Sequence, residues 1–185
     1  MKISIKLNIL LLYEKTLLKT LPKGEIMLKR LFTFILILSL CIGGISAQNS
    51  DYDAAMGIGP EWNMNSRYNF AMGGVYGFDV NLPESIALGF TVTGSNNLNG
   101  ITVLEPAALF RLYFLGRGSE HKGFFAQTDI GAFLIFEEGD IKPMILGGLR
   151  GGYRFIPVSH FYVEPYGRIG YPFAFGIGVM AGITF

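Results

Sequence analysis

Apolar residues alternate with small or polar residues along most of the chain after residue 50. The alternation is clearest near the C-terminus, where every second residue is apolar: Phe175, Ile177, Val179, Ala181, Ile183 and Phe185. A period of two is typical of a β-strand, because successive side chains point to opposite faces of a sheet. Each of the intervening glycines would destabilise a helix by about 1 kcal/mol, which disfavours a terminal membrane helix.

The same period recurs in seven further segments. We expect eight strands, over 53–62, 68–82, 86–93, 102–115, 123–136, 144–155, 161–171 and 175–185. Turn-rich segments separate them at 63–67, 83–85, 94–101, 116–122, 137–143, 156–160 and 172–174. If both ends of this array face the periplasm, the external connections are 63–67, 94–101, 137–143 and 172–174. Pro106 and Pro165 lie inside expected strands, where each removes a ladder hydrogen bond and puts the local register in doubt.

The face opposite the apolar one separates a membrane barrel from a soluble sandwich or cup. A water-exposed face should be rich in Lys, Glu and Thr, but here Gly and Ala dominate and charges of both signs are sparse. Only two lysines occur in 48–185, Lys122 and Lys142, both in expected connections. Small residues with few charges suit the narrow lumen of an eight-stranded barrel, which side chains just fill. Aromatic residues near the strand ends, such as Trp62 and Tyr171, match interfacial girdles.

The N-terminal region has the three parts of a secretory signal peptide. Lys29 and Arg30 precede an uncharged run from Leu31 to Ile42, and small residues follow up to Ala47. The run is shorter than the roughly 20 residues of a spanning helix. We therefore expect a signal peptide at 27–47 with cleavage after Ala47, and we interpret residues 1–26 as an extension upstream of a true start at Met27.

Composition narrows the class further. The chain of 185 residues has 50% hydrophobic and 16% charged residues and a formal net charge of +1, which excludes a disordered chain or a strongly basic nucleic-acid binder. Its single cysteine, Cys41, lies in the signal segment. The mature part thus lacks disulfides, thiolate zinc sites and cysteine nucleophiles, and suits an oxidising envelope compartment.

These features resemble the small eight-stranded outer-membrane β-barrel proteins of diderm bacteria, of the outer membrane protein A and X type. The resemblance rests on the signal peptide, the Gly and aromatic alternation, the segments 123–127 and 162–167, and the terminal Phe185 on an alternating strand. It implies an all-β, antiparallel, up-and-down transmembrane barrel over 48–185 in the outer membrane. It also implies that the barrel-assembly machinery reads the last strand, through Phe185, Ile183 and Ala181.

Six inward charges are the main candidate site. Asp129 and Arg150 fall near mid-barrel on neighbouring strands, and the levels above and below pair Glu105 with Arg168 and Glu164 with Arg111. Such charges must pair in a low-dielectric lumen. They form either a salt-bridge plug that fixes register, which we favour because the lumen holds little water, or a charge gate on an ion pathway.

Other chemistry has weaker signals. Catalysis would need a converging nucleophile and base, but both histidines, His121 and His160, fall in expected turns and also make a weak metal site. The acidic run 137–140 could attract a divalent cation, although a solvated loop is favoured. The expected external loops are short for an adhesin, since a standard interface buries about 800 Å² per partner.

The sequence therefore predicts a monomeric, non-enzymatic barrel with a structural role in the envelope. We expect contact with outer-membrane lipid and the assembly machinery, and no cofactor and no nucleic acid. The alternative is a narrow pore or a lateral path for small solutes. A soluble periplasmic ligand-binding barrel comes third.

Overall fold

The computed structural model describes residues 53–65, 69–82, 85–97, 100–114, 122–137 and 140–185. The upstream extension, the signal peptide and His121 lie outside these residues. The described part of the chain contains no helix long and apolar enough to span a membrane. It consists of eight strands: β1 (Ala54–Asn65), β2 (Asn69–Leu82), β3 (Ile86–Asn97), β4 (Thr102–Phe114), β5 (Gly123–Glu137), β6 (Asp140–Val158), β7 (Phe161–Tyr171) and β8 (Phe175–Thr184).

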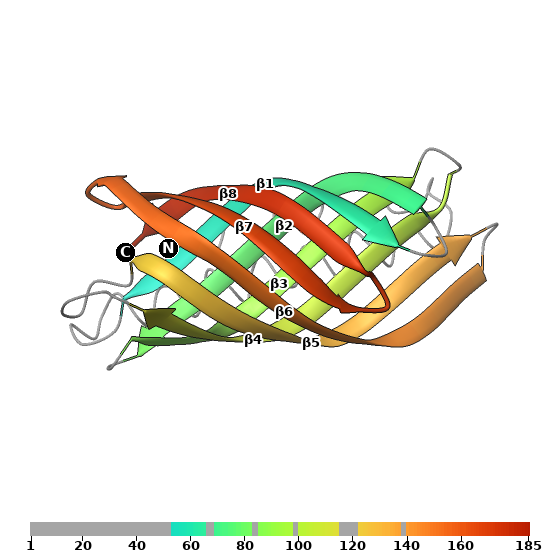
Figure 1. Ribbon diagram of the computed structural model, residues 1–185, viewed down its shortest axis with the longest axis horizontal. Helices are drawn as coiled ribbons and strands as arrows, with labels where there is room; N and C mark the ends of the chain where they lie inside the picture. The colour runs from blue at the N-terminus through green and yellow to red at the C-terminus, as the bar shows by residue number, and fades with distance from the viewer. Residues whose placement is uncertain (1–52, 66–68, 83–84, 98–99, 115–121, 138–139) are drawn as a thin grey trace, which may run out of the picture. The chain divides into compact units, whose positions relative to one another are not determined.

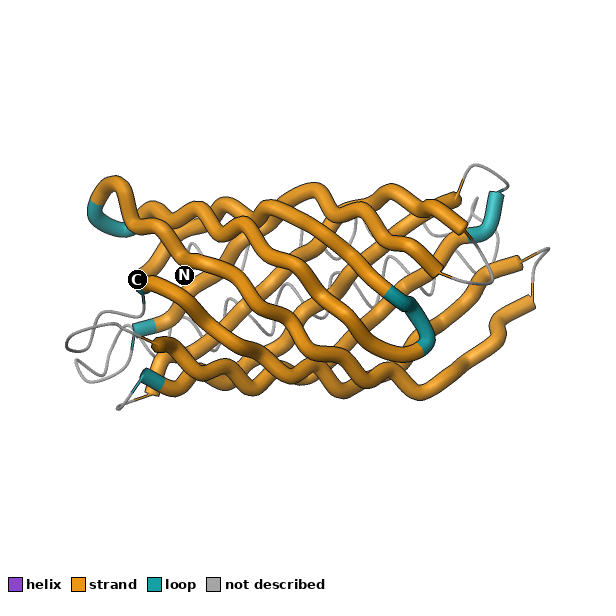
Figure 2. The backbone as a smooth tube through the Cα atoms, in the orientation of Figure 1, coloured by secondary structure: helices purple, strands orange, loops and turns teal. Residues whose placement is uncertain are grey.

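The strands form one closed antiparallel barrel in chain order, with β8 paired to β1 (Figure 1). Backbone hydrogen bonds between Ala54 and Phe185 (2.8 and 2.9 Å) complete the seam between the first and last strands. We call the end that holds this pair the near end, and the end with the β1–β2, β3–β4, β5–β6 and β7–β8 connections the far end (Figure 2). The predicted fold class, an eight-stranded up-and-down barrel, is confirmed.

The pairing register sets the width of the barrel. A path across the strands from Ala54 passes Val80, Leu88, Phe110, Thr128, Leu149, Ile169 and Phe175 and returns to β1 at Met64, a stagger of ten residues. Eight strands with this stagger tilt by about 40° and enclose a backbone cylinder of radius about 8 Å. A lumen of this size has room for side chains but not for an open water column.

Three strands extend further toward the far end than predicted. β1 ends at Asn65, β3 ends at Asn97, and β6 begins at Asp140. On the β1 and β3 extensions the buried inward residues are the polar Asn63, Ser95 and Asn97, and on the β6 extension residues 140–143 are all exposed, so the search for apolar alternation missed these segments. Three far-end connections are therefore shorter than expected, at 66–68, 98–101 and 138–139, and the fourth, 172–174, has the expected bounds.

The two strand prolines leave the register unchanged. Pro106 pairs with Val92 of β3, and the pairing of β4 with β5 resumes at Ala107 in the same register. Pro165 pairs with Val179 of β8, and the pairing of β7 with β6 has the same register on both sides of this proline. A proline lacks one N–H, so each costs a bond on one side only. The one register shift of the β6–β7 pair lies between Phe155 and Val158.

Inward glycines allow adjacent strands to approach closely. A Cβ at Gly73 of β2 would overlap the backbone carbonyl oxygen of Gly94 on β3, so only glycine fits there. A Cβ at Gly178 of β8 would lie 2.5 Å from Cζ of Tyr166. The first glycine serves the curvature of the sheet and the second makes room for a lumen side chain.

Candidate functional site

The lumen is filled mainly from one side. Strands β4 to β7 supply most of the large inward side chains, including Arg111, Tyr113, Phe125, Phe133, Arg150, Arg154, Tyr162, Tyr166 and Arg168. The facing strands β8, β1, β2 and β3 present mostly small inward residues, among them Ala55, Gly57, Ala71, Gly73, Ala87, Gly176 and Gly178. Large side chains therefore reach across the barrel into the space that the small ones leave.

Four charged residues from four strands form a closed set of ion pairs, which we call the lumen ring: Asp79, Arg111, Arg154 and Glu164. Arg111 donates from Nη1 and Nη2 to the two carboxylate oxygens of Glu164, at 2.9 Å each. Arg154 donates from Nε to Glu164 (2.7 Å) and from Nη2 to Asp79 (2.8 Å). Asp79 Oδ2 also lies 3.4 Å from Arg111 Nη1, so each carboxylate contacts both guanidinium groups.

Neutral neighbours complete the ring. Gln127 accepts hydrogen bonds from Arg111 Nε and Nη2 (2.8 and 2.6 Å), and the Tyr113 hydroxyl accepts one from Nη1 (3.0 Å). The guanidinium carbon of Arg111 lies 4.3 Å from the centre of the Phe125 ring, and that of Arg154 lies 4.3 Å from the Tyr162 ring. Buried arginines are stable only when paired and hydrogen-bonded, and here both conditions hold.

A second group of charges, the mid-lumen cluster, lies further toward the far end: Glu61, Glu105, Asp129, Arg150 and Arg168. Arg168 Nη2 lies 2.7 Å from Glu61 Oε1 and 2.8 Å from Glu105 Oε2. Arg150 is held more loosely, with Nε 3.4 Å from Asp129 Oδ2 and Nη2 4.0 Å from Glu61 Oε2. All five side chains are almost completely buried.

Phe173, from the β7–β8 connection, turns inward at the far end of the lumen. Its side chain is only 2% exposed and its ring centre lies 3.9 Å from the guanidinium carbon of Arg168. It packs in an apolar layer with Val103, Ala107, Phe133, Ile135 and Leu146. The lumen thus contains charged groups between this layer and a second apolar cluster that includes Ala55, Ala87, Tyr162 and Met180.

The structure brings together the residues that the alternation singled out. Arg111 meets Glu164 at 2.9 Å, Arg168 meets Glu105 at 2.8 Å, and Arg150 lies 3.4 Å from Asp129. Sequence reasoning missed three further members, Glu61, Asp79 and Arg154. The signal was present, because all three occupy inward positions of the same alternation.

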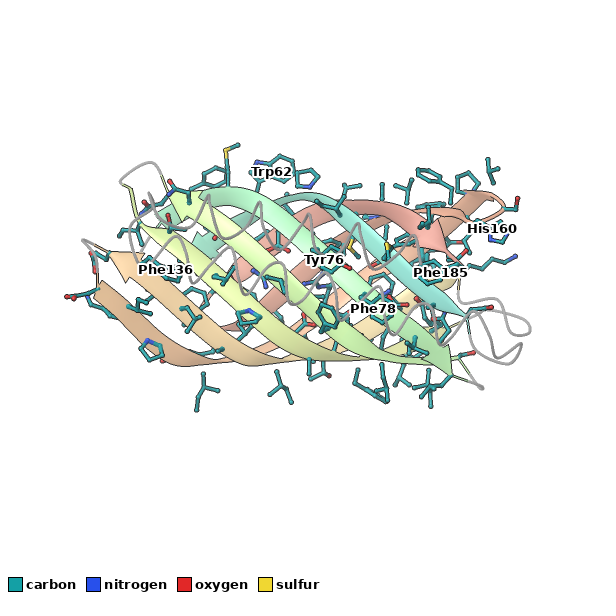
Figure 3. The ribbon with its side chains drawn as sticks, turned by 180° about the vertical axis from the view of Figure 1, so that it is seen from behind. Trp62, Tyr76, Phe78, Phe136, His160 and Phe185 are labelled. Atoms are coloured by element: carbon teal, nitrogen blue, oxygen red, sulfur yellow. The ribbon has the colours of Figure 1, made fainter. Side chains whose placement is uncertain are left out.

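The proposed assembly residues lie on the last strand. Ala181 and Ile183 belong to β8, on the alternation that faces away from the lumen, and Ile183 is 49% exposed. Phe185 directly follows β8 and takes part in the seam with Ala54. In Figure 3, Phe185 and His160 lie at the same end of the barrel, whereas Phe136 lies at the opposite end.

The described residues show no other converging chemistry. His160 is exposed in the β6–β7 turn, where its Nδ1 lies 3.1 Å from the carbonyl oxygen of Thr184. Glu137 of the acidic run forms a 2.6 Å ion pair with Lys142. No group of three His, Cys, Asp or Glu side chains in the described part of the chain is placed to hold a metal ion.

Comparisons with known proteins find the fold but no relative by sequence. No model of a protein family and no curated protein sequence matches the chain. Among solved structures, Neisserial surface protein A matches with a TM-score of 0.50 and 10% identity over 73% of this chain and 96% of its own. The N-terminal barrel domain of Pseudomonas aeruginosa OprF matches at 0.49 with 11% identity, covering 73% and 98%.

A third similar structure is Ail, the attachment invasion locus protein of Yersinia pestis, in complex with the heparin analogue sucrose octasulfate. It matches at 0.49 with 11% identity, covering 73% of this chain and 99% of that one. At such low identity the likeness shows the fold alone, because one fold supports many functions. The chain therefore has the fold of the small eight-stranded outer-membrane barrels.

Proposed function

We propose that the chain is an integral outer-membrane protein whose barrel surface contacts lipid. The distribution of charge supports this: on the described strands every charged residue is either buried in the lumen or located at the tip of the β5–β6 hairpin, at Glu137, Asp140 and Lys142. The outward positions instead carry exposed apolar side chains, such as Ile58, Ile130, Ile145, Leu149 and Ile169. In water such a surface would aggregate, whereas lipid solvates it.

Aromatic side chains near both ends agree with a membrane position. Toward the near end, Phe124 and Tyr153 pack edge to face at 4.8 Å, and Tyr153 lies 4.3 Å from Phe155. Toward the far end, Tyr171 is 62% exposed, and Trp62 points outward from β1 (Figure 3). Two such bands are typical of the membrane interfaces of outer-membrane barrels.

Within the membrane, we assign the protein a structural role in the envelope without transport. The lumen ring carries this assignment, because its four residues come from β2, β4, β6 and β7 and link these strands across the lumen. A water-filled pathway would separate these hydrogen-bonded charges. The proposal includes a monomer without catalytic activity, since the far-end connections of two to four residues offer little surface to a partner.

Single-channel recording in a planar bilayer tests this role. The full-length chain, refolded in detergent micelles and added to the bilayer, is expected to give no conductance steps. Gel mobility of the same preparation, boiled against unboiled, is the control: a boiling-dependent shift shows that the silent protein is folded. Steady conductance steps from shifted protein would instead favour the narrow pore. Solubility without detergent would favour the ligand-binding barrel.

Insertion of the barrel into the outer membrane also needs an assembly partner. We propose that the barrel-assembly machinery binds the last strand through Phe185, Ile183 and Ala181, because this strand supplies the partner for β1 at the seam. A Phe185→Ser variant should lower the amount of boiling-sensitive barrel in cells while refolding normally in micelles. Equal loss in both settings would make the effect one of stability rather than recognition.

A further inference from the structure

The two groups of lumen charges differ in net charge. The lumen ring has two carboxylates and two guanidinium groups, and is neutral. The mid-lumen cluster has three carboxylates, from Glu61, Glu105 and Asp129, but only the guanidinium groups of Arg150 and Arg168. With all five side chains ionised, the mid-lumen cluster carries one uncompensated negative charge.

The excess is concentrated at Glu61 and Glu105. Glu61 Oε1 and Glu105 Oε2 both lie within 2.8 Å of the same nitrogen, Arg168 Nη2. That nitrogen also donates a 2.9 Å hydrogen bond to Asn63 Oδ1. Both carboxylate oxygens are buried, and despite these short distances neither accepts a well-aligned hydrogen bond. Two buried carboxylate oxygens therefore compete for one nitrogen that also donates to Asn63 Oδ1.

Arg150 does not compensate for this deficit. Its Nε, Nη1 and Nη2 all lack a hydrogen-bonding partner, and the group stacks on the Tyr166 ring at 4.3 Å. The remaining polar neighbour of Glu61 is the Tyr166 hydroxyl, which donates to Oε2 at 2.6 Å. The amide nitrogen of Asn63, on the same strand as Glu61, is buried and also unpartnered. β2, β3 and β8 contribute no ionised side chain to this level in the described part of the chain.

We propose that the mid-lumen cluster binds one positive charge from solution, as a proton on Glu61 or Glu105 or as a small monovalent cation beside these two carboxylates. One proton on either carboxylate, or one monovalent ion, makes the cluster neutral. A divalent ion would leave an excess of positive charge. An uncompensated charge in a closed lumen surrounded by lipid is far more costly than either arrangement.

The test compares the full-length protein with Glu105→Gln, which removes the excess charge with little change of shape. Unfolding by urea is measured in phosphatidylcholine vesicles, first against pH, then against sodium concentration at constant ionic strength with N-methylglucamine as the replacement cation. If the folded cluster holds a proton that the unfolded chain lacks, raising the pH weakens folding. The folding equilibrium constant of the wild type, relative to that of the variant, then falls up to tenfold for each unit that the pH rises, a loss of stability of about 1.4 kcal/mol.

A bound cation gives a different result. The folding equilibrium constant of the wild type then rises up to tenfold per tenfold increase in sodium, whereas Glu105→Gln shows no such rise. Asp79→Asn is the matched control, because the same carboxyl-to-amide change in the neutral lumen ring creates an excess of positive charge. It should destabilise the barrel strongly, while Glu105→Gln should not. Equal dependence of wild type and Glu105→Gln on both pH and sodium overturns the proposal.

If Glu105→Gln does not fold, infrared spectroscopy of the wild type tests the proposal. A proton in the cluster gives the carbonyl band of a protonated carboxylic acid in neutral deuterated buffer. A cation gives no such band, but a stability of the wild type that depends on sodium. Absence of both the band and the sodium dependence overturns the proposal.

Discussion

Arg111 on β4 and Glu164 on β7, 53 residues apart in the chain, meet inside the barrel through two hydrogen bonds of 2.9 Å. The parallel arrangement matches the planar guanidinium to both carboxylate oxygens, which is the strongest geometry for such a pair. Because the two residues come from strands that are not neighbours, the pair fixes the cross-section of the barrel. It therefore contributes to both the stability and the closure of the lumen.

Loss of Arg111 should be severe. Arg111→Met leaves Glu164 and Asp79 to share Arg154, and breaking a buried ion pair in this way costs about 3–5 kcal/mol. Urea unfolding in vesicles measures the change. The double variant Arg111→Met with Glu164→Gln should recover part of the loss, because the remaining Asp79 and Arg154 are again balanced. A double variant no more stable than Arg111→Met alone would contradict this account.

Replacement of an inward glycine by alanine should destabilise the barrel where the new Cβ would overlap the backbone of the neighbouring strand. In Gly73→Ala the new methyl group overlaps the carbonyl oxygen of Gly94, and we expect a cost of about 1–3 kcal/mol from the forced backbone shift. Gly147→Ala is the control, since a Cβ there meets no atom within 4 Å. The control should be neutral or slightly stabilising, because alanine restricts the unfolded chain. Equal effects of both changes would argue against close strand approach at Gly73.

The cost in stability of an arginine placed on the outer surface should depend on the depth of that position in the bilayer. Ile130 lies in the middle of β5 and is 64% exposed, so Ile130→Arg should cost about 2–4 kcal/mol in vesicles. Asn96, near the far end of β3, already presents a polar side chain that donates to Thr102 at 2.8 Å. Asn96→Arg should cost only about 0–1 kcal/mol. Similar costs for the two variants would contradict the proposed membrane position.

Phe173 should stabilise the packing of the far end without being needed to block ion flow through the lumen. Phe173→Ala removes a side chain that is 2% exposed, and the resulting cavity should cost about 3 kcal/mol, whereas Phe173→Leu should cost less. The lumen ring remains intact in both variants, so neither should conduct in a planar bilayer. Conductance steps from Phe173→Ala would show that the far-end residue, and not the lumen ring, closes the barrel.

The sequence was informative about strands because one property, the alternation of side chains, recurs over every element. It was less informative where the inward residues are polar, as at Asn63 and Asn97, since hydrophobicity no longer marks the strand there. The membership of the lumen ring was harder still. Asp79 and Arg154 meet only because the register advances ten residues around the barrel, and that stagger is a property of all eight pairings together.

The seam between β1 and β8 has a consequence for the order of folding. Seven of the eight strand pairings join neighbours along the chain, and only the seam brings together residues as distant as Ala55 and Thr184. Local hairpins can form early. Pairing β1 with β8 is slow, because the chain between them loses conformational entropy before the contacts of the seam can stabilise the closed barrel. Glu61 lies on β1 and its partner Arg168 on β7, so the two face each other only after this step. Dehydration of the Glu61–Arg168 ion pair is therefore confined to the final stage of folding.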